Sequence, residues 1–241
     1  MTASIRKLKI APTAIVGEAP SYDGAGRGEL TGLSREMRLR LKRIFDIVMS
    51  LVLLVLFSPV FLVVVIASLL SSREPLFFTQ TRIGQNRRGS VGRGRIDRRW
   101  NDLGGRQFRI VKFRTMHADT PSYATSPVRG SDPRITPVGR VLRRTCLDEL
   151  PQLFNVLKGE MSLVGPRPEM PFIVEKYDDI QRQRLRAKPG ITGPWQLHGL
   201  RDRPIHETIG WDLHYVRHWS LHLDLAILFE TFVFALRARN H

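Results

Sequence analysis

Acidic residues and cysteines are both scarce in this chain. Its 241 residues include 22 Asp and Glu against 38 Lys and Arg, which gives a formal net charge of +16. The one cysteine, Cys146, excludes an intramolecular disulfide and any metal site built from several cysteines. The excess of positive charge predicts an anionic partner, such as a phosphorylated substrate, an anionic lipid or a nucleic acid.

No segment near the start of the chain has the form of a secretory signal. The first long apolar run begins near Ile47, too far along the chain for a cleaved leader. Residues 1–34 are rich in Gly, Ala, Ser and charged residues without periodicity, so we expect them to form a disordered tail. The sequence also has no internal repeats or heptads, which excludes a solenoid or a coiled coil.

The histidines near the C-terminus do not form a recognisable metal motif. His214, His218 and His222 are spaced four residues apart, so they would share one face of a helix. The ligand spacing of a zinc site does not accompany them. We therefore interpret them as a partly exposed helix face.

One long apolar run lies between two basic flanks. Residues 47–70 carry no charge, and as a straight helix they would be about 36 Å long, enough to cross a bilayer core of about 30 Å. Ser58 and Pro59 lie at the midpoint, where the missing proline N–H predicts a kink. Because basic flanks favour the cytoplasmic side, a hairpin that enters and returns is as consistent with the sequence as a kinked span. We expect Asp46 to pair at the protein surface with a basic residue one turn earlier.

Two adjacent carboxylates, Asp148 and Glu149, open a segment with one apolar face. The apolar face consists of Leu150, Leu153, Phe154 and Leu157, which fall at helical spacing. Pro151 is expected in the first turn of this helix, and Gly159 at its C-terminal end. Thr145 and Asp148 have the spacing of a capping box, although Asp148 could itself be the cap.

The carboxylate pair has two interpretations. Acidic residues in a first turn often do no more than stabilise the helix dipole. In so basic a chain, however, an ionised Asp148 could attack phosphorus and form an acyl phosphate, with Glu149 as a base or a metal ligand. Mg²⁺ suits carboxylates and phosphate oxygens, and nearby arginines and lysines would neutralise the remaining charge.

Seven short motifs follow one another between residues 40 and 237. They are KRIFDI (42–47), Ser58-Pro59, FFTQTRIG (77–84), KFRTM (112–116), DPRIT (132–136), the segment from Leu147 to the PRP turn at Pro168, and PGITG (189–193). Taken together, they resemble the bacterial sugar transferases, which are monotopic phosphoglycosyl transferases.

The resemblance implies transfer of a sugar 1-phosphate from a UDP-sugar to undecaprenyl or another polyprenyl phosphate. The products would be a polyprenyl-diphosphate sugar and UMP, in the first step of exopolysaccharide, capsule or O-antigen synthesis. It also implies a monotopic protein on the cytoplasmic face of the bacterial inner membrane, with a re-entrant helix broken at Ser58-Pro59. Membrane lipids and later glycosyltransferases are the implied partners, a homodimer is compatible with the sequence, and nucleic acid is not expected.

The same resemblance assigns roles to site residues. Asp148 would be the covalent nucleophile of a ping-pong mechanism, with Glu149 beside it, and both would be ligands of Mg²⁺ or alternatively Mn²⁺. The residues expected to bind substrate or phosphate are Lys112, Arg114, Arg143 and Arg167. Cys146 departs from the family, in which a serine is more usual before the acidic pair.

We therefore expect an α/β protein that is mostly helical and irregular, with a small sheet. The expected parts are the tail over 1–34, a re-entrant membrane hairpin over 35–73 and a catalytic domain with interfacial amphipathic helices over 74–241. An Arg- and Gly-rich stretch at 86–105 is interpreted as a basic insertion. Short strands are predicted at 76–78 and 108–113, and helices at 138–144 and 221–236. The alternative is a non-enzymatic basic protein that binds membranes or nucleic acid.

Overall fold

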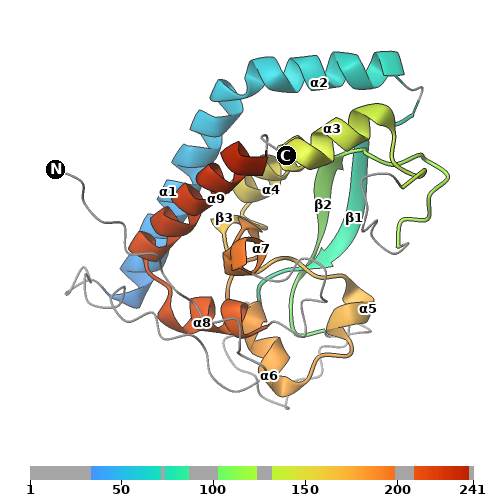
Figure 1. Ribbon diagram of the computed structural model, residues 1–241. Coiled ribbons are helices and arrows are strands. Elements are labelled where there is room, and N and C mark those ends of the chain that lie inside the picture. Colours follow the sequence, from blue (N-terminus) through green and yellow to red (C-terminus); the bar gives the residue numbers. More distant parts are fainter. Residues whose placement is uncertain (1–33, 72–73, 87–102, 124–131, 199–208, 239–241) are drawn as a thin grey trace.

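The computed structural model describes residues 34–71, 74–86, 103–123, 132–198 and 209–238 (Figure 1). The expected tail, apart from residue 34, and most of the expected insertion at 86–105 lie outside the described residues. Within these ranges the chain is mostly helical, with two small sheets, in agreement with the predicted fold class.

The elements follow the expected order, but several bounds differ. The helices are α1 (Arg35–Leu56), α2 (Ser58–Ser71), α3 (Pro137–Thr145), α4 (Gln152–Leu157), α5 (Pro171–Val174), α6 (Asp179–Arg182), α7 (Pro194–His198), α8 (Gly210–His218) and α9 (Leu221–Ala238), with 3₁₀ turns η1 (Leu147–Glu149) and η2 (Gln183–Arg186). The strands are β1 (Phe77–Ile83), antiparallel to β2 (Gln107–Phe113), and β3 (Ser162–Val164), parallel to β4 (Gly190–Thr192). The strand predicted at 76–78 was too short, because β-branched residues continue the pattern to Ile83.

The apolar run forms two helices that meet at Phe57. Pro59 has no N–H to donate to the carbonyl of Val55, and the hydroxyl of Ser58 donates to that carbonyl instead, at 2.8 Å. The two axes differ in direction by 59°. Among the described helices, no single one is long and apolar enough to cross a membrane, whereas the bent pair α1–α2 meets that criterion when its two members are taken together.

The first half of α1 is fixed to the rest of the protein by its charged residues. Lys42 Nζ lies 2.5 Å from Asp224 Oδ2 of α9, and Arg43 donates to the carbonyls of Val156 and Leu157 at the end of α4. The surface pair expected for Asp46 was wrong. This carboxylate is buried, at 1% exposure, and accepts bonds from the Ser162 hydroxyl and the Leu163 N–H, because α1 packs directly on β3.

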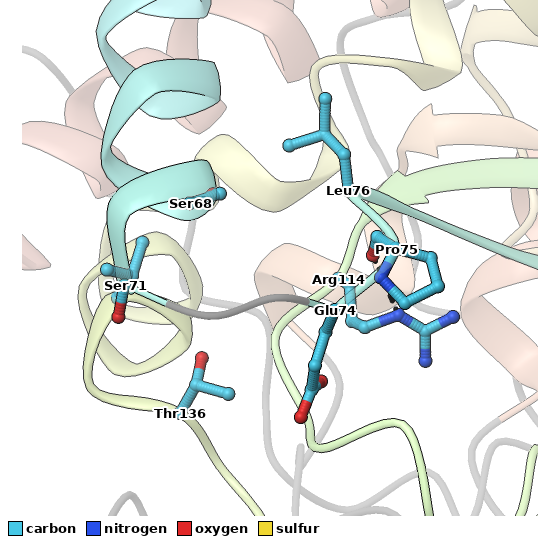
Figure 2. Close-up of a pocket in the computed structure, with 8 residues that line it drawn as sticks. Ser68, Ser71, Glu74, Pro75, Leu76, Arg114 and Thr136 are labelled. Carbon is cyan, nitrogen blue, oxygen red and sulfur yellow. Dashed lines mark hydrogen bonds between the residues drawn. The ribbon is translucent and has the colours of Figure 1, made fainter.

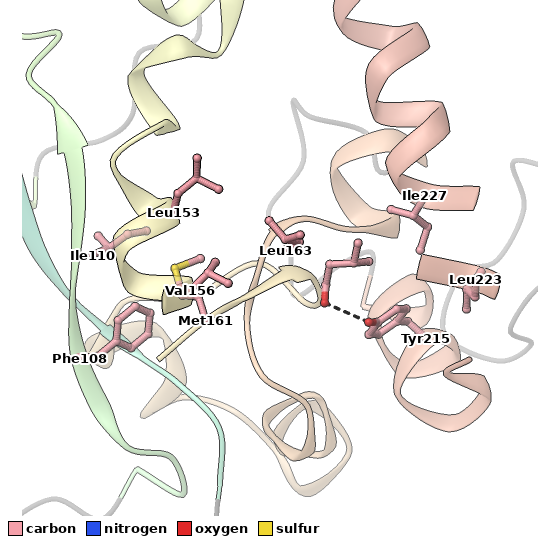
Figure 3. Close-up of a cluster of buried hydrophobic side chains, with 10 residues drawn as sticks. Phe108, Ile110, Leu153, Val156, Met161, Leu163, Tyr215, Leu223 and Ile227 are labelled. Atoms are coloured by element: carbon pink, nitrogen blue, oxygen red, sulfur yellow. Dashed lines mark hydrogen bonds between the residues drawn. The ribbon is translucent and has the colours of Figure 1, made fainter. Parts of the chain in front are cut away.

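The largest apolar cluster joins the β1–β2 hairpin to the C-terminal helices (Figure 3). It contains Phe108 and Ile110 of β2, Leu153 and Val156 of α4, Met161, Leu163 and Val164 around β3, Tyr215 of α8, and Leu223 and Ile227 of α9. In this cluster α4 packs against β2 on one side and β3 on the other. The acidic pair, which lies shortly before α4, is therefore held over one end of the β1–β2 hairpin.

Candidate active site

The acidic pair lies in a tight connection between two helices. Helix α3 begins at the cap Thr136, whose Oγ1 accepts from Gly139 N at 2.9 Å, and ends at Thr145. Cys146 then takes a left-handed conformation, with φ of 57°. This conformation ends α3, and Asp148 and Glu149 belong to the separate 3₁₀ turn η1.

The helix expected to start with the acidic pair starts instead at Gln152, after Pro151. The capping box was also wrong, because Thr145 Oγ1 donates back to the carbonyl of Val141 within α3. Gly159 ends α4 as predicted, with φ of 78° and a bond from its N–H to the carbonyl of Val156. Phe154, predicted on the buried face, is exposed.

Glu149 is held by two cations from distant parts of the chain. Its Oε1 lies 2.5 Å from Lys112 Nζ of β2 and 3.6 Å from Arg167 Nη2 of the PRP turn. Burial on its own would raise the pKa of Glu149, but the charges and hydrogen bonds of Lys112 and Arg167 outweigh it and lower the pKa to about 2. Glu149 is therefore ionised and fixed in place.

Asp148 has a different environment from its neighbour. Burial raises its pKa, and the negative charge of Glu149 adds to this effect, while Lys112, Arg143 and Arg167 oppose it. Within the described part of the chain, no donor bonds to its carboxylate. Asp148 is thus the carboxylate of the pair that remains available for chemistry.

Three of the four predicted phosphate-binding residues lie at the pair, and Arg114 lies elsewhere. The Arg143 guanidinium influences the Asp148 carboxylate from α3 and contacts Met116 Sδ at 3.9 Å. Arg114 Nε donates to the carbonyl of Pro75, and its guanidinium lies over the ring of Phe78. Figure 2 shows Arg114 lining a small pocket beneath the C-terminal end of α2. The pocket is also lined by Ser68, Ser71, Glu74, Leu76, Thr136 and Val138.

A further cation, Arg82 of β1, was missed by the sequence analysis. It donates to the carbonyl of Pro168 at 3.2 Å and to Gln80 Oε1 at 2.6 Å. Burial, and then the charge of Arg167, lower the pKa of Arg82 to about 10. The charges of the Glu169 and Glu149 carboxylates act in the opposite direction.

The strand pattern could have identified Arg82. Phe78, Gln80 and Arg82 alternate along β1, so they share one face. Phe78 is directly opposite Lys112 in the antiparallel pair, so Lys112 projects from the same face. The signal was lost because the predicted strand ended at residue 78.

A buried arginine supports the PRP turn from behind. Arg184, 2% exposed, donates to the carbonyl of Arg167 at 2.8 Å and to the Tyr177 hydroxyl at 2.6 Å, and it forms an ion pair with Asp212. At Gly165 a Cβ would come within 2.2 Å of the carbonyl of Lys188, so only glycine allows this close approach. The backbone that carries Arg167 is therefore rigidly placed.

A comparison with known proteins identifies the family of this chain. A family model described as bacterial sugar transferase matches residues 37–238. The chain belongs to the bacterial sugar transferase family. It is therefore a transferase, and the alternative of a non-enzymatic basic protein no longer applies.

Several curated relatives carry informative names. The exopolysaccharide production protein ExoY of Sinorhizobium fredii is 37% identical over 216 residues, which cover 83% of this chain and 88% of that protein. The undecaprenyl-phosphate galactose phosphotransferase of Salmonella typhimurium is 40% identical over 212 residues, or 82% of this chain and 40% of that protein. The UDP-glucose:undecaprenyl-phosphate glucose-1-phosphate transferase of Caulobacter vibrioides is 38% identical over 202 residues, which cover 79% of this chain and 67% of that protein.

Proposed function

We propose that this chain transfers a sugar 1-phosphate from a UDP-sugar to undecaprenyl phosphate, in the initiating step of exopolysaccharide synthesis. The names of the relatives support the substrates. The observation that carries the proposal is the contrast within the acidic pair, where Glu149 is bound by Lys112 and Arg167 while Asp148 has a raised pKa. Cations that surround a reactive carboxylate suit attack on an anionic diphosphate.

In the proposed reaction Asp148 is the nucleophile. One carboxylate oxygen attacks the phosphorus that carries the sugar, and the bond from this phosphorus to the bridging oxygen breaks, so that UMP leaves. A phosphate oxygen of undecaprenyl phosphate then attacks the same phosphorus, and the bond to Asp148 breaks and restores the carboxylate. Asp148 suits this role because, among the described residues, no donor occupies its carboxylate oxygens, and an ionised carboxylate can act as a nucleophile.

The surrounding residues have supporting roles in this proposal. Lys112 and Arg167 orient Glu149 and, with Arg143, neutralise negative charge on the phosphates. Glu149 keeps both cations in place and reduces their net attraction for bulk anions. Arg114, whose contacts are with the α2–β1 connection, is not assigned a step.

The donor set fits a Mg²⁺ ion, with Mn²⁺ as the alternative, that is held largely by substrate. Among the described residues, no group of three Asp, Glu, His or Cys side chains is arranged for a metal. Mg²⁺ is usually bound through one or two carboxylates together with substrate phosphates, and Asp148, assisted by Glu149, supplies that minimum. When bound, the ion would neutralise charge on the diphosphate.

We propose further that α1 and α2 form a re-entrant hairpin on the cytoplasmic face of the inner membrane. Large apolar side chains are exposed around the bend and along both helices, including Val52, Val55, Leu56, Leu62, Val63, Ile66, Leu69 and Leu70. Helix α9 adds Phe229, Phe232 and Phe234. Such surfaces are typical of interfacial helices, and they would bring the acidic pair within reach of a lipid-linked phosphate.

The test is UMP release by the full chain in detergent or nanodiscs, with undecaprenyl phosphate, Mg²⁺ and a panel of UDP-sugars. Asp148→Asn should lower turnover roughly a thousandfold or more, because the amide is not a nucleophile. The matched control Asp179→Asn, at an exposed position of α6, should leave turnover unchanged. Without the lipid acceptor, wild type should carry a phosphosugar on Asp148, detectable by mass spectrometry. Full turnover by Asp148→Asn would exclude this mechanism.

A further inference from the structure

Two exposed aromatic rings near the site are in contact with each other. Tyr123 and Phe172 form an edge-to-face pair, with ring centroids 5.9 Å apart and an angle of 83° between the ring planes. Tyr123 is 52% exposed and Phe172 is 44% exposed. Neither ring belongs to the apolar clusters of the core. Exposed aromatic rings offer planar surfaces on which nucleic acid bases stack.

Hydrogen bonds connect the Tyr123 segment to the cations of the active site. Gln80 Nε2 donates to the carbonyl of Ser122 at 2.5 Å, next to Tyr123, and Gln80 Oε1 accepts from Arg82. Arg82 in turn donates to the carbonyl of Pro168, which follows Arg167.

The Phe172 segment is joined to β1, the strand that carries Arg82. Helix α5 follows the PRP turn directly, and the Ile83 N–H donates to the carbonyl of Glu169 at 2.9 Å. Met170 Sδ accepts from Gln80 Nε2 at 3.6 Å. Both aromatic residues are therefore held at fixed positions relative to the residues that we expect to bind phosphate.

We propose that Tyr123 and Phe172 bind the nucleobase of the nucleotide-sugar donor by stacking. This inference rests on the proposed function and deepens it. A nucleotide carries a planar base one ribose away from its phosphates, and Gln80 joins the two ring segments to a strand face that also carries Arg82 and lies beside Lys112. The aromatic pair supplies affinity for the base, and the cations supply affinity for the diphosphate.

The location favours a water-soluble ligand over a lipid tail. The apolar surface of α2 adjoins the end of the β1–β2 hairpin that contains Phe77 and Phe113, because Phe61 of α2 packs against both rings. Helix α5, which carries Phe172, lies at the opposite end of the β1–β2 hairpin from α2 (Figure 1). The base would thus bind on the side away from the proposed membrane face, and the lipid acceptor would approach from the α2 side.

The experiment measures binding of UMP and of inorganic phosphate to the full chain in nanodiscs, by calorimetry, together with KM for both substrates. Tyr123→Ala and Phe172→Ala should each weaken UMP binding roughly 5- to 100-fold, the usual effect of losing one base-stacking ring. Their affinity for phosphate and their KM for undecaprenyl phosphate should not change. Tyr123→Phe keeps the ring and should bind UMP within about twofold of wild type, as should the surface control Ile180→Ala.

Any other result would contradict the inference. UMP affinity that is unchanged in both alanine variants, while wild type still releases UMP, rejects the base site and leaves the proposed function intact. A raised KM for UDP-sugar with unchanged UMP affinity would assign the rings to the sugar, and a raised KM for the lipid alone would assign them to the acceptor. Absence of UMP release by wild type from every UDP-sugar rejects the proposed function itself. Thermal unfolding of each variant identifies any loss that comes from misfolding.

Discussion

Asp148 and Glu149 are neighbours in the chain, and their different properties come from residues far away in the sequence. Lys112 from β2 and Arg167 from the PRP turn both form ion pairs with Glu149, whereas they act on the Asp148 carboxylate through their charge alone. The sequence could single out the carboxylate pair and Arg167 within one motif and Lys112 within another, whereas Arg143 lies between two motifs. It could not predict which carboxylate is paired, since that depends on how β2 and the PRP turn pack around η1.

Lys112 and Arg114 offer a matched test on one segment of chain. Lys112→Met removes the charged partner of Glu149 and a cation of the phosphate site, so kcat/KM for UDP-sugar should fall about tenfold to hundredfold. Arg114→Met removes contacts with Pro75 and Phe78 and should change kcat/KM less than about threefold. Steady-state UMP release measures both. Equal losses in the two variants would show that Arg114 also acts on substrate, as the KFRTM motif first suggested.

At the scale of elements, periodicity predicted the helices better than the turns between them. The apolar spacing of residues 150–157 located α4, and Gly159 correctly marked its end. The 3₁₀ turn η1 was not predictable, because it depends on Cys146 adopting a left-handed conformation that L-residues other than glycine and asparagine seldom take. The histidine face predicted for one helix was wrong, because His214 and His218 lie on α8 while His222 lies on α9, and His214 is buried.

Helix α8 should make the fold sensitive to mild acid through His214. Burial, and then the charges of His218 and Arg217, lower the pKa of His214 below its usual value near 6.5. Between the folded and unfolded pKa values the unfolded chain binds more protons, so this contribution to stability is complete above about pH 6.5 and is lost as pH falls. The fall in Tm between pH 7.5 and 5.5 should therefore be smaller for His214→Gln than for wild type.

The exposed His222 of α9 provides the control for this comparison. His222→Gln should show the same fall in Tm as wild type, because the substitution changes an exposed side chain and removes no buried group. The explanation based on α8 would be wrong if the two histidine variants had identical pH profiles.

For the whole molecule, the decisive contacts join segments that are distant in sequence. Lys42 and Asp224, which are 182 positions apart, fix α1 to α9. At the other end of the apolar run, Val64 of α2 is buried against Phe113 and Leu142. Motif order could indicate the family, but it could not distinguish a hairpin from a span, since the two basic flanks fit either arrangement. Both helices pack on the same folded body.

This shared packing predicts that the two ends of the α1–α2 pair lie on the same side of the membrane. In a Cys146→Ser background, Glu36→Cys and Ser71→Cys mark the start of α1 and the end of α2, and both positions are exposed. A membrane-impermeant maleimide should label neither cysteine in intact spheroplasts and both after the cells are broken. Wild type, with exposed Cys146 next to the acidic pair, should behave in the same way. Labelling of one engineered cysteine in intact spheroplasts would establish a spanning helix, because only a span separates the two flanks.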